Sequence, residues 1–254
     1  MFFTRYVALG DSMSIDLYPA LDAGETDVAV NLERLADAGA VAALGAASLF
    51  YRNDEARWPE EQADDLVTRY PGITLHNFAE DGATIGDIFG GQLAQLEETD
   101  EPTLVTLTAG GNDLLSAVAN KPRASLLDAI ANDVGDAYEF LIDAIRRAVP
   151  NGLIITSTIY DPSDGSGVIP GMFDELGELP LKVLERLNKH IRRLTDGTPR
   201  TALADAHAHF LGHGASSSDD DRWYWRRSMI EPNAAGANEI RMLWRQVVDA
   251  HHPD

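Results

Sequence analysis

Five short apolar runs, each ending in a polar or glycine-containing segment, constrain the fold of this 254-residue chain more than any other feature. The runs are Tyr6 to Leu9, Thr74 to Phe78, Leu104 to Thr108, Leu153 to Ser157 and Thr201 to Ala204. Helical periods separate them, and from Leu126 to Val149 apolar residues recur at spacings of three and four. Such alternation requires a mostly parallel sheet covered on both faces. The sequence therefore predicts a three-layer α/β/α protein with a five-stranded sheet.

Several other segments carry weaker predictions. Pro180 is typical of a first helical turn, and a last helix is expected around Ile240 to Val248. The small-residue run from Ala38 to Ser48 fits a closely packed helix, and the aromatic trio Trp223 to Trp225 is expected to be buried rather than to line a pocket. Three long segments are not expected to join the core: Asp16 to Glu60, Tyr160 to Leu179, and His207 to Ser228. No repeat or linker divides the chain, so residues 1–254 are predicted to form a single domain.

Charge and cysteine content weigh against several classes of function. The formal net charge of −21 opposes binding to nucleic acid and to anionic membranes. The absence of cysteine excludes disulfides, a cysteine nucleophile and thiolate metal sites. The first residues show neither a basic leader nor an apolar stretch long enough to span a membrane, which predicts a cytoplasmic protein. A processed secreted chain would look the same.

Polar residues follow the first three apolar runs. Ser12 comes directly after the first, within Gly-Asp-Ser, Gly82 follows the second, and Asn112 follows the third. Because the carboxyl ends of parallel strands meet at one edge of a sheet, these residues are expected to converge. A serine on a tight turn suits a nucleophile, although a helix cap is the competing interpretation. Backbone amides and the Asn112 side chain would stabilise an oxyanion.

These segments together resemble the SGNH, or GDSL-type, hydrolases. The resemblance is carried by GDSMS at 10–14, the glycine of EDGAT at 80–84, and GGND at 110–113, in the family's order and spacing. It implies a flavodoxin-like sheet, Ser12 as nucleophile, and oxyanion donors from Ser12, Gly82 and Asn112. It implies an ester or other acyl substrate, from lipids to acetylated carbohydrates, and no metal or organic cofactor.

The last block departs from the family pattern. Pro232, Asn233 and Gly236 of the segment EPNAAG match the pattern. However, Glu231 stands where the family places a histidine, and Ser228 stands where it places an aspartate. A free glutamate has a pKa of about 4.3 and is a poor acceptor for a serine proton, whereas burial raises it toward roughly 6 or 7. The base is therefore Glu231 or a histidine from elsewhere. His213 is the foremost such histidine, although fixing a loop is the more ordinary role for it.

Other functions stay open at this point. Asp205, His207 and His209 alternate, so on a strand they would share a face and suit a metal, whereas in a helix the alternation has no such meaning. Without its histidine, the protein is alternatively a catalytically impaired binding protein for an acyl or carbohydrate ligand. A flavodoxin-like nucleotide or flavin binder is a third hypothesis.

Overall fold

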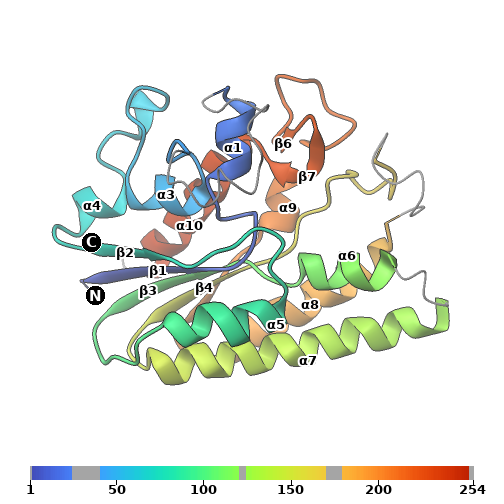
Figure 1. Ribbon diagram of the computed structural model, residues 1–254, viewed down its shortest axis with the longest axis horizontal. Helices are drawn as coiled ribbons and strands as arrows, with labels where there is room; N and C mark the ends of the chain where they lie inside the picture. The colour runs from blue at the N-terminus through green and yellow to red at the C-terminus, as the bar shows by residue number, and fades with distance from the viewer. Residues whose placement is uncertain (1, 25–40, 120–123, 170–178, 252–254) are drawn as a thin grey trace.

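The computed structural model describes residues 2–24, 41–119, 124–169 and 179–251. Its central sheet is five-stranded and wholly parallel, in the order β2-β1-β3-β4-β5 (Figure 1). The strands are β1 (Arg5–Leu9), β2 (Thr74–Asn77), β3 (Thr103–Leu107), β4 (Leu153–Ser157) and β5 (Thr201–Ala204). A two-stranded antiparallel ribbon, β6 (Tyr224–Trp225) with β7 (Ser228–Pro232), lies outside this sheet. The prediction of a three-layer fold with five strands is confirmed, with each strand starting and ending within one residue of its apolar run.

Helices connect the strands and cover the sheet. The α-helices are α1 (Leu17–Asp22), α3 (Ala46–Tyr51), α4 (Leu66–Arg69), α5 (Ile85–Asp87), α6 (Gly111–Ala119), α7 (Ala124–Ala148), α8 (Leu181–Gly197), α9 (Ala206–Phe210) and α10 (Ala234–His251). Short helical turns are η1 (Pro59–Glu61), η2 (Ile88–Gln92) and η3 (Leu93–Gln95). Pro180 occupies the N-cap of α8 rather than its first turn. The small-residue run is helical only from Ala46 onward, and its residues 38–40 lie outside the described ranges.

The two faces of the sheet build two separate cores. Tyr6 and Ala8 of β1 face a cluster that contains Phe50 of α3 and Trp244 of α10. Val7 and Leu9 face the opposite cluster, built with α5, α7 and α8. Figure 1 shows α3 and α10 on one side of the sheet and the long helix α7 on the other. This alternation follows from the two-residue period of a strand, and it leaves the carboxyl ends of the strands to carry the polar residues.

All three long segments contribute to the core, contrary to expectation, since Tyr160 of the second segment belongs to the same cluster as Trp244. Helix α3, from the first segment, is largely buried, and Phe210 and Tyr224, from the third, are fully buried. The burial predicted for the aromatic trio is confirmed for Tyr224 and Trp225, which are 0% and 8% exposed. Aromatic residues bury much apolar surface wherever the chain lets them, and loop length alone carries no information about it.

Candidate active site

The turn after β1 is held in an unusual conformation. Gly10 has a φ of +146°, and a Cβ there would lie 2.1 Å from Oγ1 of Thr108. The side-chain amide of Gln92 brackets the same residue, because Oε1 accepts from Gly10 N and Nε2 donates to Gly10 O, both at 2.8 Å. Only glycine fits this position. The turn therefore presents the next two residues, Asp11 and Ser12, in a fixed orientation.

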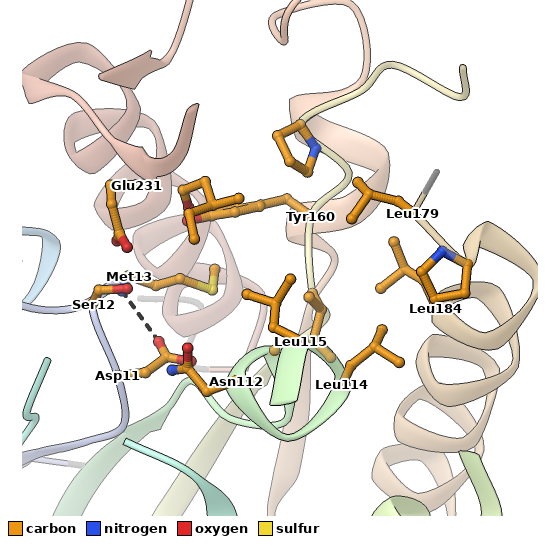
Figure 2. A pocket seen from close by; sticks show the side chains of 15 residues that line it. Asp11, Ser12, Met13, Asn112, Leu114, Leu115, Tyr160, Leu179, Leu184 and Glu231 are labelled. Carbon is orange, nitrogen blue, oxygen red and sulfur yellow. Dashed lines mark hydrogen bonds between the residues drawn. The ribbon is translucent and has the colours of Figure 1, made fainter. Parts of the chain in front are cut away.

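Ser12 does not cap a helix. Helix α1 begins at Leu17 with Asp16 at its N-cap, so the competing interpretation of Ser12 as a helix cap does not hold. Ser12 lies instead in the turn that precedes α1 and is 7% exposed. Its side chain lines a pocket (Figure 2). Without a capping role, the hydroxyl is available for another interaction.

Asn112 lines the same pocket, from the first turn of α6. Its Nδ2 donates to the carbonyl of Ala83 at 3.1 Å, which ties α6 to the loop after β2. The neighbouring Asp113 strengthens this tie, since its carboxylate accepts from the amide of Ile85 at 3.0 Å. An amide nitrogen carries two hydrogens, so one donor of Asn112 remains beyond the bond to Ala83.

Gly82 stands in that loop, one residue before Ala83, and is not among the residues that line the pocket. Its φ of +70° explains the glycine, because other residues rarely adopt this conformation. Within the described ranges, the backbone amides of Ser12 and Gly82 have no hydrogen-bond acceptor. The structure thus brings Ser12 and Asn112 to one cavity and leaves Gly82 at its side.

Glu231 completes the group from β7, and Figure 2 shows its carboxylate directed toward Ser12. Glu231 is 7% exposed, and Oε2 has no hydrogen-bond partner within the described ranges. Burial raises the pKa of this carboxyl to about 8, a rise that the side-chain hydrogen bond from Ser12 opposes. The negative charges of Asp81 and Asp11 raise the pKa further. The carboxyl is therefore a much stronger base than a free glutamate.

Sequence reasoning missed several acidic and phenolic groups that lie around Glu231. Burial raises the pKa of Asp11 to about 6, although its Oδ1 accepts from Met13 N at 3.1 Å. The Tyr18 hydroxyl on α1 donates to Oδ2 of Asp81 at 2.9 Å. Asp81 adjoins Gly82 in the EDGAT segment, so its place in the sequence could have identified it as a site residue. No sequence pattern could have identified Tyr18, because only the tertiary fold brings α1 to this loop.

The histidines considered as alternative bases lie elsewhere. His213 stacks on Trp223 with ring centroids 3.5 Å apart, and its Nδ1 lies 2.8 Å from the carbonyl of Asp221. It does not line the pocket, so it fixes its loop as the more ordinary role predicted. His207 and His209 belong to α9, where alternation does not place side chains on one face. His209 pairs with Glu239 at 2.9 Å.

Asp205, at the N-cap of α9, accepts two hydrogen bonds from Arg192. In the parts of the chain that the structure describes, no three imidazole or carboxylate groups gather as a metal site. None of the helices in those parts is long and apolar enough to cross a bilayer.

Together with the solvent space at its mouth, the pocket beside Ser12 has a volume of about 680 Å³. Its walls come from the turn after β1, the start of α6, the segment after β4, the start of α8, and β7. Its polar side chains are Asp11, Ser12, Asn112, Tyr160 and Glu231. The Tyr160 hydroxyl is engaged, because it donates to the carbonyl of Ile230 at 2.6 Å. The arrangement offers one buried hydroxyl, one carboxylate beside it and amide donors nearby, which are the parts needed for acyl transfer.

The chain is similar to a known protein family and to several solved structures. The profile of the GDSL-like lipase/acylhydrolase family matches residues 8–238. No curated protein sequence matches the chain. Among solved structures, an extracellular lipase from Streptomyces rimosus is similar, with 18% identity, a TM-score of 0.56, and coverage of 98% of this chain and 100% of that chain. Phospholipase A1 from Streptomyces albidoflavus NA297 has 20% identity, a TM-score of 0.56 and the same coverage. A family 3 carbohydrate esterase from Clostridium thermocellum has 15% identity and a TM-score of 0.53, covering 98% and 96%.

Proposed function

Because this chain belongs to the GDSL-like lipase/acylhydrolase family and is a hydrolase that acts on esters, we propose that it works through an acyl-serine intermediate on Ser12. The observation that carries the proposal is the pairing of a buried hydroxyl with a buried carboxylate at one end of a pocket. A serine hydroxyl is a weak nucleophile until a neighbouring base accepts its proton. Glu231 is the group placed to do so.

In the proposed reaction, Ser12 Oγ attacks the ester carbonyl carbon while its proton passes to the Glu231 carboxylate. The tetrahedral intermediate collapses, and the alcohol leaves with the proton that Glu231 held. A water molecule then attacks the acyl-serine, giving a proton to Glu231. Ser12 takes that proton back as the carboxylic acid departs. Each step moves one proton between Glu231 and an oxygen, and no redox partner is needed.

Three donors are proposed to stabilise the negative oxygen of the intermediate. They are the amide of Ser12, the second hydrogen of Asn112 Nδ2, and the amide of Gly82. The support for Ser12 and Asn112 is their place on one pocket wall. Gly82 is included because the resemblance to the family implies it, and because its neighbour Ala83 is bonded to Asn112. Donors of this kind are worth about a hundredfold or more each in kcat.

The raised pKa of Glu231 allows a carboxylate to take the place of a histidine in this mechanism. A carboxylate with a pKa near 4 would hold a serine proton poorly, whereas one with a pKa of about 8 is a much stronger base. The same shift means that roughly a tenth of the enzyme carries the ionised carboxylate at pH 7. Ester hydrolysis should therefore be slow at neutral pH and faster in mild alkali.

A covalent probe tests the nucleophile. A fluorophosphonate is expected to label the wild-type protein at Ser12 at pH 8.5, and Ser12→Ala is expected to abolish both labelling and ester turnover. Ser218→Ala, on an exposed loop, serves as the matched serine control and should retain both. Mass spectrometry of the labelled peptide identifies the site. Labelling of another residue, or full turnover in Ser12→Ala, would rule out the mechanism.

The alternative, a catalytically impaired binding protein, depends on the protonation state of Glu231. If Glu231 keeps its proton throughout the accessible pH range, the pocket holds a ligand but does not turn it over. Absence of turnover for any ester up to pH 9.5, combined with saturable binding of a ligand, would favour this function. Activity that appears in Glu231→His would then show that only the base was missing.

A further inference from the structure

The pocket beside Ser12 is polar at one end and apolar at the other. Figure 2 shows Ser12, Asp11 and Glu231 together, while Leu114, Leu184 and Leu179 lie on the side away from them. The apolar end is built from α6 and from the start of α8, and none of the described residues that line it is charged. An apolar extension that begins at the reactive hydroxyl favours a substrate whose reacting end is polar and whose remainder is hydrocarbon.

We propose that this extension binds the acyl chain of the substrate, so that the enzyme selects esters of medium-length aliphatic acids over acetyl esters of carbohydrates. The inference rests on the proposed function of Ser12 and adds the substrate class to it. Each methylene that the pocket removes from water is expected to raise kcat/KM by about fourfold until the space is filled. An acetyl group would leave the leucine walls uncovered and would gain none of this.

The polar groups of the pocket do not suit a sugar. The Tyr160 hydroxyl is committed to the carbonyl of Ile230, and Asp11 accepts from the amide of Met13. Apart from the second oxygen of Asp11, the polar groups left over among the described residues are those assigned to the reaction. Sugar hydroxyls placed against Leu114 and Leu184 would lose their hydrogen bonds to water without replacement, which disfavours their binding.

The acyl side of the ester is assigned to the pocket rather than the alcohol side. In the proposed mechanism the acyl group stays attached to Ser12 through both halves of the reaction, while the alcohol must leave after the first. A pocket that begins at Ser12 and is walled by helices α6 and α8 holds a group that stays.

Chain-length profiles test the assignment. With p-nitrophenyl esters at pH 8.5, kcat/KM is expected to rise from acetate through butyrate to octanoate, with a ceiling of roughly 200-fold for the four methylenes between the last two. A second series varies the alcohol instead, from ethyl to octyl acetate, and is expected to change little. A flat acyl profile, or a steep rise only in the alcohol series, would overturn the proposal.

Substitution of a wall residue links the profile to this pocket. Leu115 lines the pocket from α6 and is only partly buried, so Leu115→Trp fills the space at little risk to the fold. The octanoate to butyrate ratio of kcat/KM is expected to fall at least tenfold in Leu115→Trp and to rise for longer chains in Leu115→Ala. Leu211→Trp, at a leucine that is 45% exposed outside the pocket, is the matched control and should keep the wild-type ratio. Equal ratios in all three variants would refute the assignment.

Binding measured without turnover separates this inference from the proposed function. Calorimetry with Ser12→Ala is expected to show decanoate or decanol binding that Leu115→Trp, introduced into the same background, weakens at least tenfold. Binding of this kind in a protein without esterase activity would sustain the pocket assignment and remove the mechanism. Turnover that depends on Ser12 but not on chain length, with no alkyl binding, would leave the mechanism and remove the assignment.

Discussion

Replacing Glu231 by glutamine is expected to stabilise the protein in alkaline solution, in spite of removing its proposed base. Glu231 is 7% exposed, and burial raises its pKa from 4.5 to about 8. A raised carboxyl pKa means that the folded protein holds the proton more tightly than the unfolded chain does. As the pH rises from 4.5 to 8, the unfolded chain releases this proton first, so the free energy of unfolding falls. Glutamine resembles the protonated acid in shape and does not titrate.

The size of the effect follows from the shift. A difference of about 3.5 pH units corresponds to a ceiling of roughly 5 kcal/mol, at about 1.4 kcal/mol per unit, reached above pH 8. Local relaxation and water entry reduce such values. Glu231→Gln is therefore expected to differ little from wild type at pH 4.5 and to be about 2 to 5 kcal/mol more stable at pH 9.

Urea unfolding, followed by tryptophan fluorescence at intervals from pH 4.5 to pH 9, measures the difference. Glu80→Gln provides the control, because it removes one carboxylate from an exposed position in the same loop as Asp81. The reasoning would be refuted if Glu231→Gln and wild type kept a constant difference over this range. It would also be refuted if Glu80→Gln reproduced the gain.

Three further predictions follow from the site. On the acid side of its pH profile, kcat/KM should fall with an apparent pKa near 8. Glu231→His should move this pKa toward about 6.5, the ordinary value for histidine. An apparent pKa that stays the same in that variant would exclude residue 231 as the base. Asp81→Asn removes a negative charge that raises the pKa of Glu231, so the same apparent pKa should move to lower pH while Glu80→Gln leaves it unmoved. Gly10→Ala places a Cβ 2.1 Å from Thr108 Oγ1 and should cost about 2 kcal/mol or more in urea unfolding; an unchanged midpoint would show that the turn adapts.

The sequence predicted the fold in detail because its strands are short, apolar and separated by clear helical periods. Runs such as Leu153 to Ser157 coincide with the observed strand. It erred where a local pattern had more than one meaning. Ser12 is followed by residues that suit a helix, but the helix starts later. All three long segments carry core residues that no periodicity marked.

The candidate site could likewise be predicted only in part. Ser12 and Asn112 could be expected together from sequence alone, since the ends of parallel strands share one edge of a sheet. Glu231 could be named from its place in the last block, but its proton affinity could not. That property depends on burial and on the charges of Asp11 and Asp81, which are far from Glu231 along the chain.

By itself, then, the order of residues determined the layers, the positions of the strands along the chain, and the set of groups available for chemistry. These features depend on periodicity and on where polar residues follow apolar runs. Tertiary structure alone decided how those groups behave. It buried Glu231, brought Tyr18 into contact with Asp81, and placed leucines of α6 and α8 in the pocket that Ser12 lines. Desolvation and cavity shape are sums over residues brought together from the whole chain, so no local stretch encodes them.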